Sequence, residues 1–365
     1  MFFHGKVFFV LETGVYMNYF IEILKAIVFG IVEGITEWLP VSSTGHMIIL
    51  GQFFGFESTQ GKAFYDFFLV IIQLGAILAV VLSFIKELWP FGKKKSSKQK
   101  KEIWMTWAKI LVASIPAGII GILFDDLLDQ YLYNYVTVSV TLIVYGVVFL
   151  AIEFLLKRKA MKIKERYHLN REIGTAMNDD VSEDSMTNYP VFHIKSIRDI
   201  SIQYAMIIGL AQCLALIPGT SRSGVTICAA LLLSIDRRTA AKFSFYLSIP
   251  AMLGGSLIKG ALYGMKVAQG KAEGINGFQI GLILISMAVA FAVSLLVINF
   301  FMKMLRTRTF NIFGIYRILL GIILLIVFFT VNKGQISTVS CVVPYSDVVL
   351  TDLSLCSCHP TVLSL

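Results

Sequence analysis

Residues Gly30 to His46 read GIVEGITEWLPVSSTGH, and this polar stretch lies between the apolar segments IEILKAIVF and MIILGQFFGF. Ionisable side chains at membrane depth cost about 2.5–3.5 kcal/mol each on insertion scales, so they indicate a functional site. Leu39-Pro40 is expected to end the first helix, because proline lacks an N–H group and disfavours helix in the residue before it. A short polar turn then covers 41–45, and the apolar run restarts at Met47. A helix broken at this depth is tolerated only inside protein or around a wet cavity, so the stretch predicts a re-entrant hairpin.

The composition is that of a polytopic membrane protein. Hydrophobic residues make up 56% of the chain and charged residues 15%, whereas a soluble globular chain is about 25% charged. The formal net charge is +9, but the lysines and arginines lie mainly in connections between apolar segments. This placement favours cytoplasmic loops over a nucleic-acid surface. The five cysteines show neither a disulfide framework nor the spacing of a zinc site.

A second polar break covers Gly209 to Thr226 and reads GLAQCLALIPGTSRSGVT. Laid over the first break, with a slip of one residue in the middle, it matches at five positions: Gly30 with Gly209, Glu33 with Gln212, Pro40 with Pro218, Ser43 with Ser221, and Gly45 near Gly224. The chain therefore contains an internal repeat whose chemistry has diverged. The first copy carries acids and a histidine, and the second carries an arginine among hydroxyl groups.

Full membrane spans need about 20 apolar residues. Segments of this kind are found at 64–89, 103–124, 136–156, 239–262, 278–302 and 312–331. The two polar breaks are shorter units, and we expect them to form hairpins over 18–56 and 200–234. Four connections are rich in lysine or arginine, and the positive-inside rule places them in the cytoplasm: 91–101, the segment after Leu156, 236–238 and 303–308.

The predicted fold is an all-α polytopic membrane protein with two inverted-topology repeats, each a re-entrant helical hairpin plus three transmembrane helices. Because three is odd, the second half enters the membrane upside down, and the hairpin tips can meet near the midplane. The predicted units are an N-terminal extension (1–16), a first repeat (17–156), a polar cytoplasmic loop (157–199), a second repeat (200–332) and an atypical C-terminal tail (333–365).

Glu33 and Glu37 are four residues apart, which places both carboxylates on one helix face. Two carboxylates in a low-dielectric cavity repel each other, so one is expected to stay protonated near neutral pH and to act as acid or base. The same pair of oxygen ligands suits a divalent cation, Mg²⁺ or Ca²⁺. The structural alternative is an exposed acid pair on a surface helix, and the apolar flanks argue against it.

Ser42, Ser43, Thr44 and His46 follow the glutamates directly. A serine becomes a nucleophile when a base activates it, and a glutamate or histidine across the turn supplies one. The histidine is suited to proton transfer or to direct attack on phosphorus. The structural alternatives are hydroxyl groups that satisfy the turn backbone and a core histidine with its hydrogen bonds satisfied.

The second break is suited to holding phosphate. Small residues, hydroxyl groups and a helix N-terminus favour anions. The guanidinium of Arg222 matches phosphate oxygens two at a time. The structural alternative is an ion pair with Glu33 or Glu37, which would itself join the two motifs. Candidate substrate-binding residues in and around the two turns are Ser42, Thr44, Gly219, Ser221, Ser223 and Thr226.

The motifs EGITEWLPVSSTGH and PGTSRSGVT resemble those of the bacterial undecaprenyl-diphosphate phosphatase family, the bacitracin-resistance (BacA/UppP) type. The resemblance runs from about Met17 to about Asn332. It implies a multi-pass protein of the bacterial plasma membrane that removes the terminal phosphate of undecaprenyl diphosphate. The product would be the lipid carrier for peptidoglycan synthesis. The functional positions carried over are Glu33, Glu37, Ser42, Ser43, His46, Ser221, Arg222 and Thr226.

With this resemblance, Ser43 is expected to be the nucleophile or to position a water, with Glu37 as base and His46 as proton shuttle. Arg222 would neutralise phosphate charge, and Glu33 would tune Glu37 or hold a cation. The expected partners are a polyprenyl diphosphate lipid and the bilayer, with no nucleic acid and no organic cofactor. A homo-oligomer is left open. Two alternative functions remain. The first is a polyprenyl-phosphate flippase, because inverted repeats are a transporter architecture. The second is a scaffold that binds a lipid phosphate.

Overall fold

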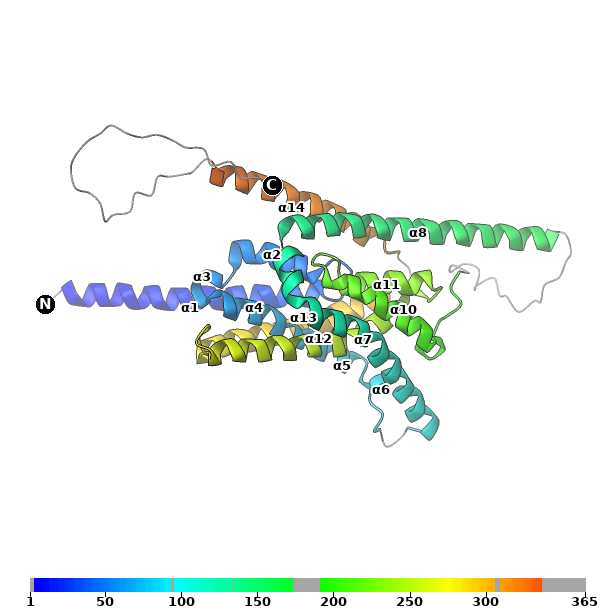
Figure 1. Ribbon diagram of the computed structural model, residues 1–365, viewed down its shortest axis with the longest axis horizontal. Coiled ribbons are helices and arrows are strands. Elements are labelled where there is room, and N and C mark those ends of the chain that lie inside the picture. Colours follow the sequence, from blue (N-terminus) through cyan, green and yellow to red (C-terminus); the bar gives the residue numbers. More distant parts are fainter. Residues whose placement is uncertain (1–2, 93–94, 133, 173–190, 306–308, 337–365) are drawn as a thin grey trace.

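A computed structural model describes residues 3–92, 95–132, 134–172, 191–305 and 309–336, and this part of the chain is helical almost throughout (Figure 1). The N-terminal half contains α1 (Phe3–Thr36), α2 (Ser43–Phe54), α3 (Glu57–Gln60), α4 (Lys62–Ile71), α5 (Gln73–Ser83), α6 (Ile85–Leu88), α7 (Ser97–Leu132) and α8 (Tyr135–Glu172). The C-terminal half contains η1 (Ile197–Asp199), α10 (Ile202–Gln212), η2 (Cys213–Leu216), α11 (Arg222–Leu232), α12 (Arg237–Ala268), α13 (Gly277–Met304) and α14 (Asn311–Ile336).

Six helical segments of the described chain are long and apolar enough to cross a membrane: Lys62–Ser83, Ser97–Phe124, Tyr135–Arg166, Arg237–Ala268, Gly277–Met304 and Asn311–Thr330. They correspond to the six predicted spans, so the chain is an all-α, multi-pass membrane protein. The first span is not one continuous helix, because α4 and α5 are joined at Ile72.

The two predicted hairpins are present, with shifted helix ends. The first consists of α1, a turn and α2, and the second of α10, η2, a turn and α11. The predicted polar turn over 41–45 is wrong after Ser42: α2 begins at Ser43, so the polar residues after Ser42 form its first turn. The predicted boundary at Met17 falls inside α1, which begins at Phe3. The predicted start of the polar loop at 157 is wrong, because α8 continues as a helix to Glu172. The C-terminal tail from 337 onward and positions 173–190 of the predicted loop lie outside the described residues.

The first helix of each hairpin packs against a membrane-spanning helix of the other half. Helix α1 of the first half lies on α13, and α10 of the second half lies on α7. Both contacts run through a glycine that the sequence overlay pairs: a Cβ on Gly30 would collide with the Ser286 carbonyl, and one on Gly209 with the Ala113 carbonyl. The third spans, α8 and α14, run side by side along one edge of the bundle (Figure 1). This exchange of contacts supports the predicted repeat, and the opposite insertion of the halves stays a prediction.

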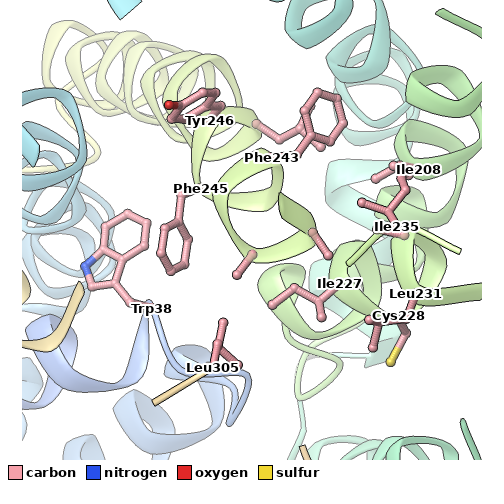
Figure 2. Packing of buried hydrophobic residues seen from close by; sticks show 14 of the residues in the cluster. Trp38, Ile208, Ile227, Cys228, Leu231, Ile235, Phe243, Phe245, Tyr246 and Leu305 are labelled. Atoms are coloured by element: carbon pink, nitrogen blue, oxygen red, sulfur yellow. The ribbon is translucent and has the colours of Figure 1, made fainter. Parts of the chain in front are cut away.

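The main hydrophobic core joins the first hairpin turn and helix α11 to α12. Trp38, in the turn after α1, is fully buried and packs edge-on against Phe245 of α12, with ring centroids 5.2 Å apart (Figure 2). On the other side, Ile227 and Leu231 of α11 fill the space between α12 and α10 (Figure 2). The core thus fixes the first turn and α11 against α12.

The orientation is open to a labelling experiment. With the basic connections in the cytoplasm, Lys95→Cys is expected to stay unlabelled by a membrane-impermeant maleimide added to intact cells. Asp129→Cys and Lys271→Cys are expected to be labelled, because their connections lie on the other side. The opposite pattern would invert the topology. Equal labelling after cell lysis serves as the control for thiol reactivity.

Candidate active site

Two helix N-termini, those of α2 and α11, form the frame of the site. Each is capped by a serine with a positive φ: Ser42 (φ 74°) accepts a hydrogen bond from the Gly45 N–H, and Ser221 (φ 70°) accepts one from the Gly224 N–H. The shared geometry makes Ser42 the equivalent of Ser221, so the sequence overlay of Ser43 on Ser221 is wrong by one residue. Ser43 and Arg222 therefore occupy the same position, the first residue of each helix.

Glu37 joins the two motifs. Its Oε2 accepts a hydrogen bond from the Ser43 hydroxyl at 2.5 Å, and its Oε1 pairs with a terminal nitrogen of Arg222 at 2.9 Å. One carboxylate thus holds both the candidate nucleophile and the candidate phosphate ligand, although 185 positions separate Glu37 from Arg222. The side chains of Arg222 and Glu37 are 12% and 9% exposed, so this pair is largely removed from water.

Arg222 is held at both ends of its guanidinium. Besides Glu37, it donates to the Ser244 carbonyl of α12 at 2.8 Å. The same serine's hydroxyl lies 2.7 Å from that of Thr226, which also donates to the Arg222 carbonyl. Thr226 is fully buried, so it braces Arg222 and is not placed to touch a ligand. Its predicted substrate-binding role becomes a positioning role.

The remaining site residues also divide into buried residues that support the backbone and partly exposed residues. Ser223 is buried, and its hydroxyl donates towards the carbonyls of Glu37 and Leu39, both at 3.4 Å. Gly219 has φ +88° and packs against α8, where any side chain would strike Thr141. The residues that keep partial exposure come from the first turns of the two helices and their caps: Ser43, Thr44, His46, Ser221 and Arg222. A phosphate group would therefore meet both helix ends at once.

Glu33 lies one turn below Glu37, whose N–H bonds to the Glu33 carbonyl. Its side chain is fully buried, and neither carboxylate oxygen has a hydrogen-bond partner. An ionised carboxylate without partners is costly to bury, so Glu33 holds a proton or a cation. The prediction that the two glutamates share a face is confirmed, and their environments differ sharply.

His46 faces α14. Its Nδ1 lies 2.7 Å from the Ser42 carbonyl, which can only accept, so Nδ1 carries a proton. Its Nε2 lies 2.7 Å from the hydroxyl of Tyr316, and the two rings are nearly parallel. The Nε2 atom is thus poised to exchange a proton with a phenol, which is a contact that the sequence did not predict.

The sequence interpretation missed Arg317 of α14. This side chain is fully buried and donates to the Pro40 carbonyl of the first turn at 3.2 Å. It also donates to the carbonyls of Gly219 and Thr220 in the second turn, at 2.8 and 2.9 Å. Arg317 therefore fastens the two turns together. The available signal was a cation within the last apolar span, near its start, which is the same kind of signal that identified the glutamates.

The described residues contain no cluster of three or more histidine, cysteine, aspartate or glutamate side chains suited to a metal ion. Both Glu37 oxygens are already engaged by Ser43 and Arg222. Glu33 has two free oxygens and fits a cation that takes its other ligands from a bound phosphate, as Mg²⁺ commonly does.

The chain matches the family model described as bacitracin resistance protein BacA over residues 26–323, which include both turns and Arg317. Undecaprenyl-diphosphatase 1 of Clostridioides difficile is 43% identical over 309 residues, covering 85% of this chain and 97% of that protein. The undecaprenyl-diphosphatase of Enterococcus faecalis is 42% identical, covering 84% of this chain and 97% of that protein. That of Acetivibrio thermocellus is 40% identical, covering 86% and 100%. With its two turns joined at Glu37 and this match over most of its length, the chain belongs to the bacitracin resistance protein BacA family.

Proposed function

We propose that the protein is an undecaprenyl-diphosphate phosphatase of the bacterial plasma membrane. It hydrolyses the phosphoanhydride of a polyprenyl diphosphate to the monophosphate and inorganic phosphate, which returns the carrier lipid to peptidoglycan synthesis and gives bacitracin resistance. The observation that carries the proposal is the contact of Ser43 and Arg222 with the two oxygens of Glu37. A nucleophile, its base and a guanidinium within one hydrogen-bonded unit are the parts that phosphoryl transfer requires.

In the proposed reaction, the Ser43 oxygen attacks the terminal phosphorus and its proton passes to Glu37. The bond from phosphorus to the bridging oxygen breaks, and the polyprenyl monophosphate leaves with the bond's electron pair. Water then attacks the phosphoserine, gives up a proton, and releases inorganic phosphate and free Ser43. His46, joined to Tyr316, moves protons between the site and the outside. Arg222 and the N–H groups of the two helix ends stabilise the charge on the transferring phosphate.

Glu33 would hold a divalent cation if the enzyme uses one. A bound cation would neutralise diphosphate charge, and Glu33 is the residue with free oxygens to hold it. Loss of activity in EDTA that Mg²⁺ or Ca²⁺ restores, together with loss of that metal response in Glu33→Gln, would support this role. A fully active metal-free enzyme would assign Glu33 a proton instead.

The decisive test is phosphate release from undecaprenyl diphosphate by the purified protein in detergent. A phosphatase releases phosphate there, whereas a flippase has no membrane to cross and a binding scaffold leaves the substrate intact. Ser43→Ala is the matched negative control. Detection of a phosphate group covalently trapped on Ser43 would distinguish covalent catalysis from direct attack by water. No release by folded protein would overturn the proposal.

Arg222→Lys tests the guanidinium. Arginine here spans the Ser244 carbonyl and Glu37 with two nitrogens, and a lysine ammonium keeps the charge but loses this planar fork. We expect kcat to fall by at least ~10-fold, equivalent to ~1.4 kcal/mol in the barrier. Wild-type turnover in a folded lysine variant would show that Arg222 does not contact the reacting phosphate.

A further inference from the structure

A second polar cavity lies away from the two turns, where α6, the start of α7, η1 and the start of α12 come together. Its volume is about 280 Å³. Five basic and two acidic side chains line it: Lys86, Lys95, Lys195, Arg198 and Lys242, with Glu87 and Glu102. All these elements belong to the ends of the bundle that carry the basic connections, so the cavity opens on the predicted cytoplasmic side.

The acidic groups of this cavity are already paired. Both oxygens of Glu87 accept from Lys242 at 2.8 Å, and one also accepts from the Tyr246 hydroxyl at 3.0 Å. Glu102 pairs with Arg198 at 3.1 Å. These pairs cancel two of the five positive charges and leave a net positive cavity.

The remaining lysines differ in what they bind. Lys95 donates to the main-chain carbonyls of Lys86 and Trp89, which ties Lys95 to the end of α6. Within the described chain, the ammonium groups of Lys86 and Lys195 have no hydrogen bond or ion pair, and both face the cavity. Two free cations beside a walled cavity of this size are suited to a phosphate group.

An aromatic cluster adjoins residues that line the cavity, because Trp104 follows the lining residue Ile103 in α7. Trp89, Phe91 and Trp104 are 53%, 65% and 55% exposed, although their rings pack edge to face with centroids 5.4 and 6.0 Å apart. Exposed tryptophans of a membrane protein lie at the level of the lipid headgroups. Lys95 fixes this cluster to the cavity wall through its bond to the Trp89 carbonyl. The cavity therefore opens at headgroup depth, and acyl chains can lie along the aromatic rings.

We infer that this cavity binds the phosphate of an anionic membrane lipid, with Lys86 and Lys195 as the ligands and the aromatic cluster against the chains. Basic cavities between membrane helices on the cytoplasmic side are suited to such headgroups. The site is separate from the proposed phosphatase chemistry, and its test does not depend on turnover.

The experiment measures the unfolding temperature of the detergent-purified protein with added short-chain phosphatidylglycerol. A ligand of the native state raises this temperature, and we expect a rise of about 3 °C at saturation. Lys86→Gln/Lys195→Gln is expected to lose the rise. Lys62→Gln/Lys271→Gln is the matched control, because it removes the same charge from exposed lysines at the other end of the bundle, and it should keep the rise.

Two further arms identify the ligand. Short-chain phosphatidylcholine, which is neutral overall, should give little shift, and high salt should weaken the effect of phosphatidylglycerol. Inorganic phosphate alone should also give little shift, because it lacks chains to lie on the aromatic cluster. An equal rise in the Lys86/Lys195 variant would overturn the site. A full rise with inorganic phosphate would overturn the lipid as its ligand.

Discussion

Glu37→Ala and Arg222→Ala are each expected to lower kcat by at least ~10³-fold, equivalent to ~4 kcal/mol in the barrier. Glu37 is the only carboxylate that the structure places on the Ser43 hydroxyl within the described residues, so the alanine variant leaves the serine without a base. Removing Arg222 takes the charge from the phosphate and also leaves Glu37 without its cationic partner. Phosphate release by purified variants in detergent measures both effects.

The double variant should be scarcely slower than either single variant. Groups that act as one unit give strongly non-additive losses, because the first substitution already disables the unit. Fully additive losses would show that the two turns act separately. Glu22→Ala is the control: it removes a different buried glutamate, which lies within α1 and pairs with Lys25 at 2.9 Å. It should lower the unfolding temperature and leave kcat nearly unchanged.

Arg317→Met is expected to lower kcat by at least ~100-fold and also to lower the unfolding temperature. Methionine keeps an unbranched apolar stem, although a shorter one, and donates no hydrogen bond. Three buried carbonyls in the two turns then lose their donor, at a cost of about 1–3 kcal/mol for each group left without a partner. The turns can then separate, which moves Ser43 relative to Arg222, and a displacement of about 1 Å can cost ~10²-fold in rate.

Assays well below the lowered unfolding temperature separate positioning from folding. A folded Arg317→Met variant with wild-type kcat would show that the arginine stabilises the protein without aligning the site. Arg317→Lys should recover part of the stability but little of the rate, because one ammonium cannot span carbonyls from both turns. Arg238→Met, an exposed arginine at the start of α12, is the matched control and should change neither quantity.

The sequence predicted the membrane class, the six spans and the meeting of the two motifs, because hydropathy and charge are read directly along the chain. Helix ends were less predictable. The residues after Ser42 look like a turn by composition, yet the bond from the Gly45 N–H to the Ser42 hydroxyl starts α2 at Ser43. The capping hydrogen bond therefore decides where the helix starts, although the residues that follow are polar. Ser221 makes the same capping bond, which shows that Ser42, and not Ser43, is its equivalent in the first repeat.

Contacts between distant elements could not be predicted from one sequence. The pairing of Arg222 with Glu37 was foreseen only as an alternative to phosphate binding, and the structure allows one residue to serve both purposes. The contact of His46 with Tyr316 spans 270 positions and leaves no local pattern. Arg317 was visible as a cation in an apolar span, but its partners are main-chain carbonyls, which have no signature in the amino-acid sequence.

The main-chain character of these partners has a consequence for how the site could evolve. All three hydrogen bonds of Arg317 end on carbonyl oxygens, which every amino acid carries. The fastening therefore depends on the main-chain shape of the two turns, and the hydrogen bonds themselves use none of their side chains. If the halves arose by duplication, one turn could gain acids and a histidine and the other an arginine without removing a hydrogen-bond partner of Arg317. A symmetrical ancestor could thus become an asymmetrical catalyst one residue at a time.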